Sequence, residues 1–341
     1  MSDRRISGFK PTGPLQLGNY VGAIRPVVDG QDRPTIVFVA DLHAMTVPHD
    51  PQRLRELSLQ VSGLLLASGV DPRRTILYRQ SDLPAHAELH YLLECVASYG
   101  EAHRMIQFKE KGGGSGTRLS LLTYPVLMAA DILLHDIAEV PVGRDQRQHV
   151  ELTRDLALRF NERHGPVFTV PRATHPAIAA RLADLADPAA KMGKTNASGN
   201  GVLFLLDPPD VLRRKIMRAV TDTADEIVYD PATRPGVSNL LELLAVATGD
   251  DPRRIASGHT GYGALKKATA DAVIALLEPI QRRYHALSED DIEQILADGA
   301  ERAAERADAT VARTKAAMGL SSARPARAGS PATPGTAPAS R

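Results

Sequence analysis

The sequence lacks the features of several specialised classes of protein. It has a single cysteine and no tryptophan among 341 residues. One cysteine excludes an intrachain disulfide framework and a cysteine-built zinc site, so a reducing cytoplasm fits best. The longest apolar stretch, residues 119–134, contains Tyr124, Pro125 and Asp131. It falls short of the roughly 20 apolar residues that a membrane-spanning helix requires.

The chain also has little net charge. The formal net charge is +1, and charged residues make up 24% of the sequence. A protein that binds RNA over much of its surface would be plainly basic, so an RNA partner would have to be bound by a local patch. Residues 1–5 are charged and no apolar run follows them, so we expect no secretory signal.

The first half alternates short apolar runs with helical patterns. Residues 5–9, 35–40, 75–80 and 139–143 predict strands, and residues 53–68 carry apolar side chains at helical spacing. Strand, helix and strand at these intervals predict an α/β fold, with a Rossmann-like parallel sheet covered by helices. In such sheets ligands bind outside the carboxyl ends of the strands.

The second half is predicted to be helical, because strand signals stop beyond about residue 207. Helices are predicted there over residues 208–219, 237–248, 262–283 and 289–318. A further helix, over residues 146–163, is predicted before this part of the chain. We expect a catalytic domain, a helical domain, a C-terminal helix and a disordered tail rich in Pro, Ala, Ser and Gly, over residues 1–206, 207–287, 288–320 and 321–341 respectively.

A glycine-rich turn follows the first predicted strand and precedes a predicted helix. It contains Gly13 and Gly18. Glycine lets the backbone approach a ligand closely, and a helix N-terminus favours phosphate. The turn matches neither a Walker loop nor a G-x-G-x-x-G fingerprint. Taken alone, it is better interpreted as a simple tight turn.

Together with later segments, however, this turn resembles the ATP-site loop of bacterial-type tryptophanyl-tRNA synthetases. Residues 17–20 correspond to the HIGH signature of class I synthetases, with Asn19 in place of a histidine. Further matching segments follow in the family's order at residues 41–46, 105–111, 123–125, 128–133, 140–143 and 145–155. The resemblance covers about residues 5–320. It implies a class I catalytic domain that ligates L-tryptophan to tRNA(Trp) through tryptophanyl-adenylate, with a C-terminal all-helical domain.

A second segment, residues 191–195, resembles the KMSKS loop of the same enzymes. It reads Lys-Met-Gly-Lys-Thr, so Gly193 and Thr195 replace two serines while both lysines remain. Without the resemblance, a solvated loop would be the better interpretation. With it, Lys191, Lys194 and Lys111 are implied to stabilise the charge that builds on pyrophosphate.

The resemblance also implies two binding sites. For ATP it implies Lys10, Pro11, Thr12, Gly18, Asn19, Gly143, Arg144, Asp145, Leu182, Lys191, Met192, Gly193, Lys194 and Thr195. For tryptophan it implies Asp131, Tyr124, Met128, Val142, Gln146, Ile6, Gly8 and His43. Magnesium is expected on the ATP phosphates, with no protein-bound metal. Lys10 departs from the family, which commonly has glutamine there.

Asp131 is the most informative of these residues. It lies in an apolar stretch, where a carboxylate is costly to bury unless a donor meets it. Taken alone, it could equally face solvent or cap a neighbouring helix. The resemblance implies that Asp131 accepts the indole N–H of tryptophan, and that Tyr124 and Gln146 hold the ammonium and carboxylate groups.

The resemblance implies a tRNA partner and a homodimer as well. Arg213, Arg214, Lys215 and Arg218 are candidate tRNA contacts, although each alone is more typical of a solvated helix face. Residues 84–107 are expected to form much of the dimer interface. The competing interpretations are a tyrosine–tRNA ligase, a paralogue that binds tryptophan or RNA without ligase activity, and a nucleotidyltransferase for a small cofactor.

Overall fold

The structure is a computed structural model. It describes residues 4–111, 114, 116–143, 146–174, 182–193, 199–224 and 226–320. The predicted tail, residues 321–341, lies outside these ranges. Within them, no helix is both long and apolar enough to cross a membrane.

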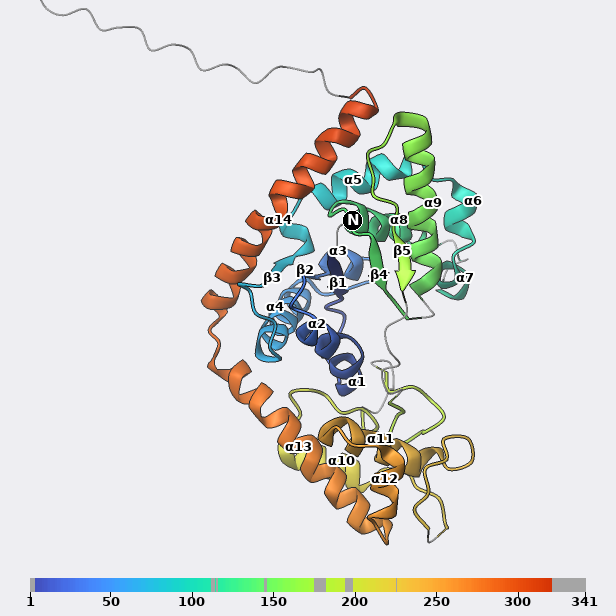
Figure 1. Ribbon diagram of the computed structural model, residues 1–341, viewed down its shortest axis with the longest axis vertical. Coiled ribbons are helices and arrows are strands. Elements are labelled where there is room, and N and C mark those ends of the chain that lie inside the picture. Colours follow the sequence, from blue (N-terminus) through green and yellow to red (C-terminus); the bar gives the residue numbers. More distant parts are fainter. Residues whose placement is uncertain are drawn as a thin grey trace, which may run out of the picture.

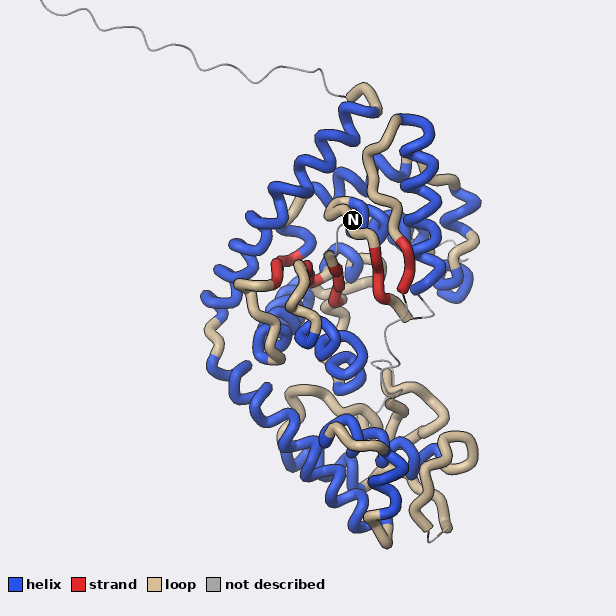
Figure 2. The backbone as a smooth tube through the Cα atoms, in the orientation of Figure 1, coloured by secondary structure: helices blue, strands red, loops and turns tan. Residues whose placement is uncertain are grey.

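A parallel sheet forms the centre of the first half (Figures 1 and 2). Strands β1 (Arg5–Phe9), β2 (Thr35–Val39) and β3 (Thr75–Arg79) lie side by side in that order, and their first residues are in register. All five residues of β2 are buried. The structure therefore confirms the predicted parallel sheet, with strand bounds within one residue of those expected.

A smaller parallel pair lies beside this sheet. Strand β4 (Glu139–Pro141) was predicted, with two further residues, but its partner β5 (Arg172–Thr174) was not. Strand β5 has three residues and none of them is fully buried. Its pairing with β4 is a tertiary contact that local sequence does not signal.

Helices cover the sheet on both sides. Helix α4 (Pro51–Ala67) links β2 to β3, and the side chain of Asp50 caps it by accepting from the backbone N–H of Arg53. Helix α8 (Leu119–Leu133) packs against both α5 (Ala85–Glu94) and α9 (Arg147–His164). The shorter elements are α1 (Leu17–Asn19), η1 (Tyr20–Ile24), α2 (Arg25–Asp29), α3 (Asp41–Ala44), η2 (Gln80–Asp82), α6 (Tyr99–His103) and α7 (Ile106–Lys111).

The second half of the chain forms a helical cluster, as predicted. It contains α10 (Pro209–Met217), α11 (Pro235–Thr248), α12 (Pro252–Ser257) and α13 (Tyr262–Ala286). Helix α14 (Glu289–Ala317) then runs back along β3 and α5, as Figure 1 shows in orange and red. This approach is close, because a Cβ atom on Gly299 would clash with the carbonyl oxygen of Leu77. The last helix therefore packs on the first half of the molecule.

Candidate active site

A cavity of about 400 Å³ opens at the carboxyl ends of β1 and β2. Helix α8 and the segment that follows β4 form its other walls. All eight residues predicted to bind tryptophan line it: Ile6, Gly8, His43, Tyr124, Met128, Asp131, Val142 and Gln146. Lys10 and Gly143, from the predicted ATP set, line it as well. The structure thus brings residues from five separate segments to one concave site.

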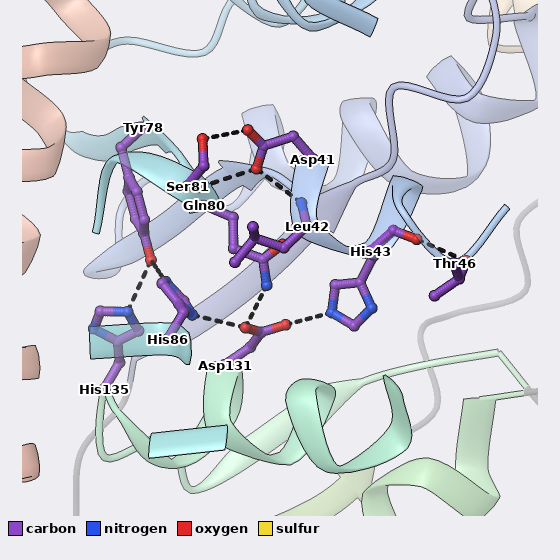
Figure 3. Close-up of polar contacts among 10 residues, drawn as sticks. All are labelled: Asp41, Leu42, His43, Thr46, Tyr78, Gln80, Ser81, His86, Asp131 and His135. Atoms are coloured by element: carbon purple, nitrogen blue, oxygen red, sulfur yellow. Dashed lines mark hydrogen bonds and ion pairs between the residues drawn. The ribbon is translucent and has the colours of Figure 1, made fainter. Parts of the chain in front are cut away.

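Asp131 lies in the wall of this cavity and is only 3% exposed. Its carboxylate accepts hydrogen bonds from Nε2 of His43 at 2.8 Å, from Nε2 of Gln80 at 2.7 Å and from Nδ1 of His86 at 2.7 Å (Figure 3). Burial raises the pKa of Asp131, but the attraction and hydrogen bonds of His43 and His86 outweigh burial and hold that pKa well below its ordinary value. The group is therefore an ionised carboxylate held by three buried donors.

Three donors leave this carboxylate with spare capacity. An ionised carboxylate has about four lone-pair positions, and the described donors use three of them. Nδ1 of His43 is also buried, and no described residue is its hydrogen-bond partner. His43 lines the same cavity. Two polar positions at this wall can therefore be satisfied by a bound molecule.

The other walls are mainly apolar. Ile6, Met128 and Val142 contribute side chains from β1, α8 and the segment after β4. Gly8 lies against the ring of Phe38, and a Cβ atom at Gly8 would come within 2.7 Å of that ring. A larger residue at Gly8 would therefore displace Phe38 in the wall. The result is a slot suited to a flat apolar group.

Lys10 adds a positive charge at the cavity. Its Nζ lies 5.1 Å from the centre of the Tyr124 ring, within the range of a cation–π interaction. The Tyr124 hydroxyl in turn lies 2.7 Å from Nε2 of His149. Tyr124 therefore lies between the imidazole of His149 and the ammonium group of Lys10. This ammonium group marks the place where an anionic group of a ligand would bind.

Gln16 joins the two predicted ATP loops. Its Oε1 accepts from the backbone N–H of Gly18 at 2.6 Å, and its Nε2 donates to the carbonyl of Met192 at 3.0 Å. The side chain of Asn19 closes the turn by accepting from the backbone N–H of Gln16 at 3.1 Å. A Cβ atom on Gly18 would lie 2.8 Å from Gln16 Oε1, so a larger residue there would displace the Gln16 side chain. Sequence patterns did not identify this link.

The second loop is held at its buried residues and open at its lysine. The backbone N–H of Met192 donates to the carbonyl of Leu182 at 3.0 Å, and both side chains are buried. Lys191 is exposed, and Gly193 is half-buried. In the first loop, Pro11 is buried and Thr12 is exposed. The predicted residues Arg144, Asp145, Lys194 and Thr195 lie outside the described residues, as does the side chain of Lys111.

The four basic candidates of α10 differ from one another. Arg213 pairs with Asp271 at 2.7 Å, and Arg214 lies 3.7 Å from Asp210. These two arginines and Arg218 are exposed. Lys215 is instead held inward, because its Nζ contacts Asp207 at 2.7 Å and donates to the carbonyl of Val202 at 2.8 Å. Among the described residues, no group of three or more His, Cys, Asp or Glu could hold a metal ion.

Two residues of the site were missed by sequence reasoning. Gln80 and His86 both donate to Asp131, and both are completely buried. Gln80 was assigned to the end of a predicted strand, where ligand-site residues of parallel sheets occur. A buried strand that ends in a polar side chain was the available signal for Gln80. His86 lies within a helix and carried no comparable signal.

Comparisons with known proteins show the family to which the chain belongs. Residues 3–278 match the family described as tRNA synthetases class I (W and Y). The chain is 53% identical over 326 residues to tryptophan–tRNA ligase 1 of Streptomyces coelicolor, covering 93% of this chain and 97% of that protein. It is 45% identical over 321 residues to tryptophan–tRNA ligase of Caldanaerobacter subterraneus, covering 93% and 98%.

Solved structures give the same result. Tryptophanyl-tRNA synthetase from Mycoplasma pneumoniae superposes with a TM-score of 0.84 at 35% identity, covering 94% of this chain and 99% of that one. The enzyme from Campylobacter jejuni in complex with ADP and tryptophan superposes with a TM-score of 0.81 at 32% identity, covering 93% and 100%.

Proposed function

The chain belongs to the bacterial-type tryptophanyl-tRNA synthetases of class I, and we propose that the cavity around Asp131 is the site at which it selects and activates tryptophan. It is an ATP-dependent enzyme that joins L-tryptophan to tRNA(Trp) through tryptophanyl-adenylate, with release of pyrophosphate and AMP.

Selection of tryptophan rests on the carboxylate of Asp131. Its remaining lone pair accepts the indole N–H, while Ile6, Met128 and Val142 enclose the flat ring. Phenylalanine fits the apolar walls but has no N–H, so it would leave a buried carboxylate incompletely satisfied, and such a site rejects it strongly. The single observation that carries this proposal is an ionised carboxylate that accepts three hydrogen bonds in the wall of a mainly apolar cavity.

The amino-acid backbone of tryptophan is proposed to lie toward Lys10 and Tyr124. Tyr124 and Gln146 hold the ammonium and carboxylate groups, and the Nζ of Lys10 lies over the same tyrosine ring. The charge of Lys10 attracts either the carboxylate or the α-phosphate. His43 offers its Nδ1 to the bound substrate.

Activation needs no side-chain nucleophile. A carboxylate oxygen of tryptophan attacks the α-phosphorus of ATP, the bond to the bridging oxygen of the β-phosphate breaks, and pyrophosphate leaves with both electrons of that bond. We propose that Gly18 and Asn19, with Gly143, position the nucleotide. Lys191 stabilises the developing charge, and the same role is predicted for Lys194 and Lys111. Magnesium would be carried on the ATP phosphates.

We propose that the enzyme is a homodimer. Three large apolar side chains on α5, α6 and α8 are exposed: Tyr91 is 66%, Tyr99 70% and Leu119 72% exposed. Exposed apolar surface marks an association site where it is contiguous, and Tyr91 and Tyr99 fall within the predicted interface, residues 84–107. Light scattering should give the mass of a dimer, and Tyr99→Asp should give a monomer. A monomeric wild-type chain would contradict the proposal.

For tRNA we propose contacts from α10. Arg213, Arg214 and Arg218 are exposed on one short helix, whereas Lys215 is committed to Asp207. Loss of phosphate contacts lowers the salt dependence of binding. A triple alanine variant of the three arginines should therefore bind tRNA more weakly and less salt-dependently, while tryptophan activation is unchanged.

We place the reaction in the cytoplasm, which suits the single unpaired cysteine, Cys95.

The experiment that tests the proposed selection is exchange of labelled pyrophosphate into ATP, with tryptophan, tyrosine or phenylalanine as the amino acid. Exchange with tryptophan alone is expected. Exchange with tyrosine at a similar rate would contradict the role given to Asp131. Transfer to tRNA is then measured separately, so that a defect in the second step is not mistaken for one in the first.

A further inference from the structure

A second cavity, of about 520 Å³, lies at the opposite edge of the central sheet. It is lined by residues at the amino ends of the three parallel strands, including Arg4, Thr35 and Arg74, and by helix α14. The tryptophan cavity is at the carboxyl ends of the same strands. The two cavities share no lining residue, so the second one is a separate site.

Arginine dominates the lining of this second cavity, which we call the arginine cavity. Five arginines surround it: Arg4, Arg74, Arg302, Arg306 and Arg313. Asp136 partly neutralises two of them, at 2.9 Å from Arg306 and 3.6 Å from Arg313. Glu305 is the one acidic residue among the described lining residues. The cavity therefore has an excess of positive charge.

Three of the five arginines form no ion pair with a described residue, although Asp136 attracts Arg4 and Asp71 attracts Arg74 from longer range. Among the described residues, no carboxylate forms an ion pair with Arg4, Arg74 or Arg302. Arg302 donates to the carbonyl of Pro72 at 2.6 Å, which holds its guanidinium at the cavity without neutralising it. Burial and the charge of Arg306 lower the pKa of Arg4, so like charges are close enough to repel each other.

We propose that this cavity binds a small anion that carries two or more phosphate groups, and that its occupancy is transmitted to Asp131. Guanidinium groups bind phosphate oxygens in a bidentate manner, and several around one cavity favour a polyphosphate over a single phosphate. A free polyphosphate and a nucleoside triphosphate share this chemistry. The second part of the proposal rests on the proposed function of Asp131.

A buried hydrogen-bond chain connects the two cavities (Figure 3). His135 lines the arginine cavity, and its Nε2 lies 2.9 Å from the hydroxyl of Tyr78. The same hydroxyl lies 2.8 Å from Nε2 of His86, whose Nδ1 lies 2.7 Å from Asp131. His86, Tyr78 and His135 are at most 1% exposed. The chain is therefore shielded from water along its length.

The protons of this chain are correlated. Because an ionised carboxylate can only accept, Nδ1 of His86 donates to Asp131. The Tyr78 hydroxyl has one proton, so it donates to one histidine and accepts from the other. An anion that changes the hydrogen bonding of His135 therefore changes the orientation of the Tyr78 hydroxyl and the polarity of His86 at Asp131.

The first test measures binding of inorganic tripolyphosphate to the full chain by calorimetry. A non-hydrolysable analogue of tryptophanyl-adenylate occupies the active site throughout. We expect one equivalent of tripolyphosphate per chain, and an affinity at least about tenfold weaker in Arg74→Ala/Arg302→Ala, because two charge-assisted contacts are lost.

The matched control for this test is Arg154→Ala/Arg163→Ala, which removes the same charge from exposed positions on α9. It should bind as the wild type does. No binding to the wild type, or an equal loss in both double variants, would overturn the site. GTP is the second probe: tighter binding than tripolyphosphate assigns the site to a nucleotide, and weaker binding assigns it to a free polyphosphate.

The second test measures tryptophan affinity without ATP, with and without saturating tripolyphosphate. The wild type should show a change of several-fold, which Arg74→Ala/Arg302→Ala should abolish. Tyr78→Phe should retain tripolyphosphate binding but lose the change, because the chain is broken. His135→Gln is the second variant should Tyr78→Phe fail to fold. The coupling would be overturned by an unchanged tryptophan affinity in the wild type, or by a change of the same size in Tyr78→Phe or His135→Gln. Neither result would contradict the proposed function, which pyrophosphate exchange tests separately.

Discussion

The cavity around Asp131, proposed to bind tryptophan, and the loop of Lys191, proposed to bind ATP, are built in opposite ways. Asp131 is buried, and three buried side chains donate to it. Lys191 is exposed at the surface of a loop whose neighbouring residue Met192 is anchored by the side chain of Gln16. Amino-acid selection depends on a fixed hydrogen-bond geometry, which burial preserves. Charge stabilisation of pyrophosphate acts over longer distances and tolerates an open loop. The two tasks should therefore be separable by mutation.

The largest effect is expected at Asp131. Asp131→Asn removes the ionised carboxylate that we propose accepts the indole N–H, and it leaves His43, Gln80 and His86 with fewer acceptor positions. We expect kcat/KM for tryptophan to fall by about 10³-fold, while KM for ATP stays near the wild-type value. Pyrophosphate exchange with each substrate varied in turn measures both. If KM for ATP rose as much as kcat/KM for tryptophan fell, the cavity and the ATP loop would not be separable.

Lys191→Ala is the converse change. Loss of one group that stabilises transition-state charge lowers kcat by about 10²-fold. The tryptophan cavity does not include Lys191, so KM for tryptophan should stay unchanged. The same exchange assay gives the split between kcat and KM. Lys191→Arg, which keeps the charge, is the control and should recover part of the activity.

The buried region should contribute its own pH dependence to stability. Burial lowers the pKa of His135 to about 3, below the value of about 6.5 in an unfolded chain. Between those values the unfolded state binds more protons, so the stability contributed by the neutral histidine is lost as pH falls from about 6.5 toward 3. The loss is about 1.4 kcal/mol per pH unit.

His135→Gln should therefore flatten the free energy of unfolding between about pH 6 and pH 4, measured by urea titration. His49→Gln changes an exposed histidine and is the matched control. A curve as steep in His135→Gln as in His49→Gln would show that other groups cause the acid sensitivity.

The smallest effect is expected at Gln16. Gln16→Ala removes the hydrogen bond to Met192 and the one from Gly18, so the two ATP loops lose their direct link. We expect KM for ATP to rise about fivefold, with KM for tryptophan unchanged. Gln16→Glu keeps the acceptor for Gly18 but loses the donor to Met192. An equal rise in both variants would assign the effect to the Met192 bond, and no rise in either would remove the link from the account.

The sequence predicted the regions of regular structure well and their contacts less well. The strands β1, β2 and β3 were predicted to within one residue, and the clearest signal was the β-branched, apolar run of β2, which is buried on both faces. The short strand β5 has no such run and depends on β4. That α14 returns to pack on β3 could not be predicted from its own pattern, because any partner could cover the same apolar face.

The site shows the same limit. Resemblance to a family supplied the eight residues predicted to bind tryptophan, and the fold brings them to one cavity. It did not supply Gln80, His86 or Gln16, whose roles depend on contacts between side chains of distant segments. Nor did it identify the arginine cavity, because Arg74 and Arg302 are more than two hundred residues apart and meet only in the folded chain.

The separation of tryptophan selection from ATP handling is tested most directly by equilibrium binding of tryptophan in the absence of ATP. Wild type, Asp131→Asn and Lys191→Ala should be compared by calorimetry under identical conditions. We expect Lys191→Ala to bind tryptophan with wild-type affinity and Asp131→Asn to bind it at least about tenfold more weakly. Wild-type affinity in Asp131→Asn, or equal weakening in both variants, would contradict this separation.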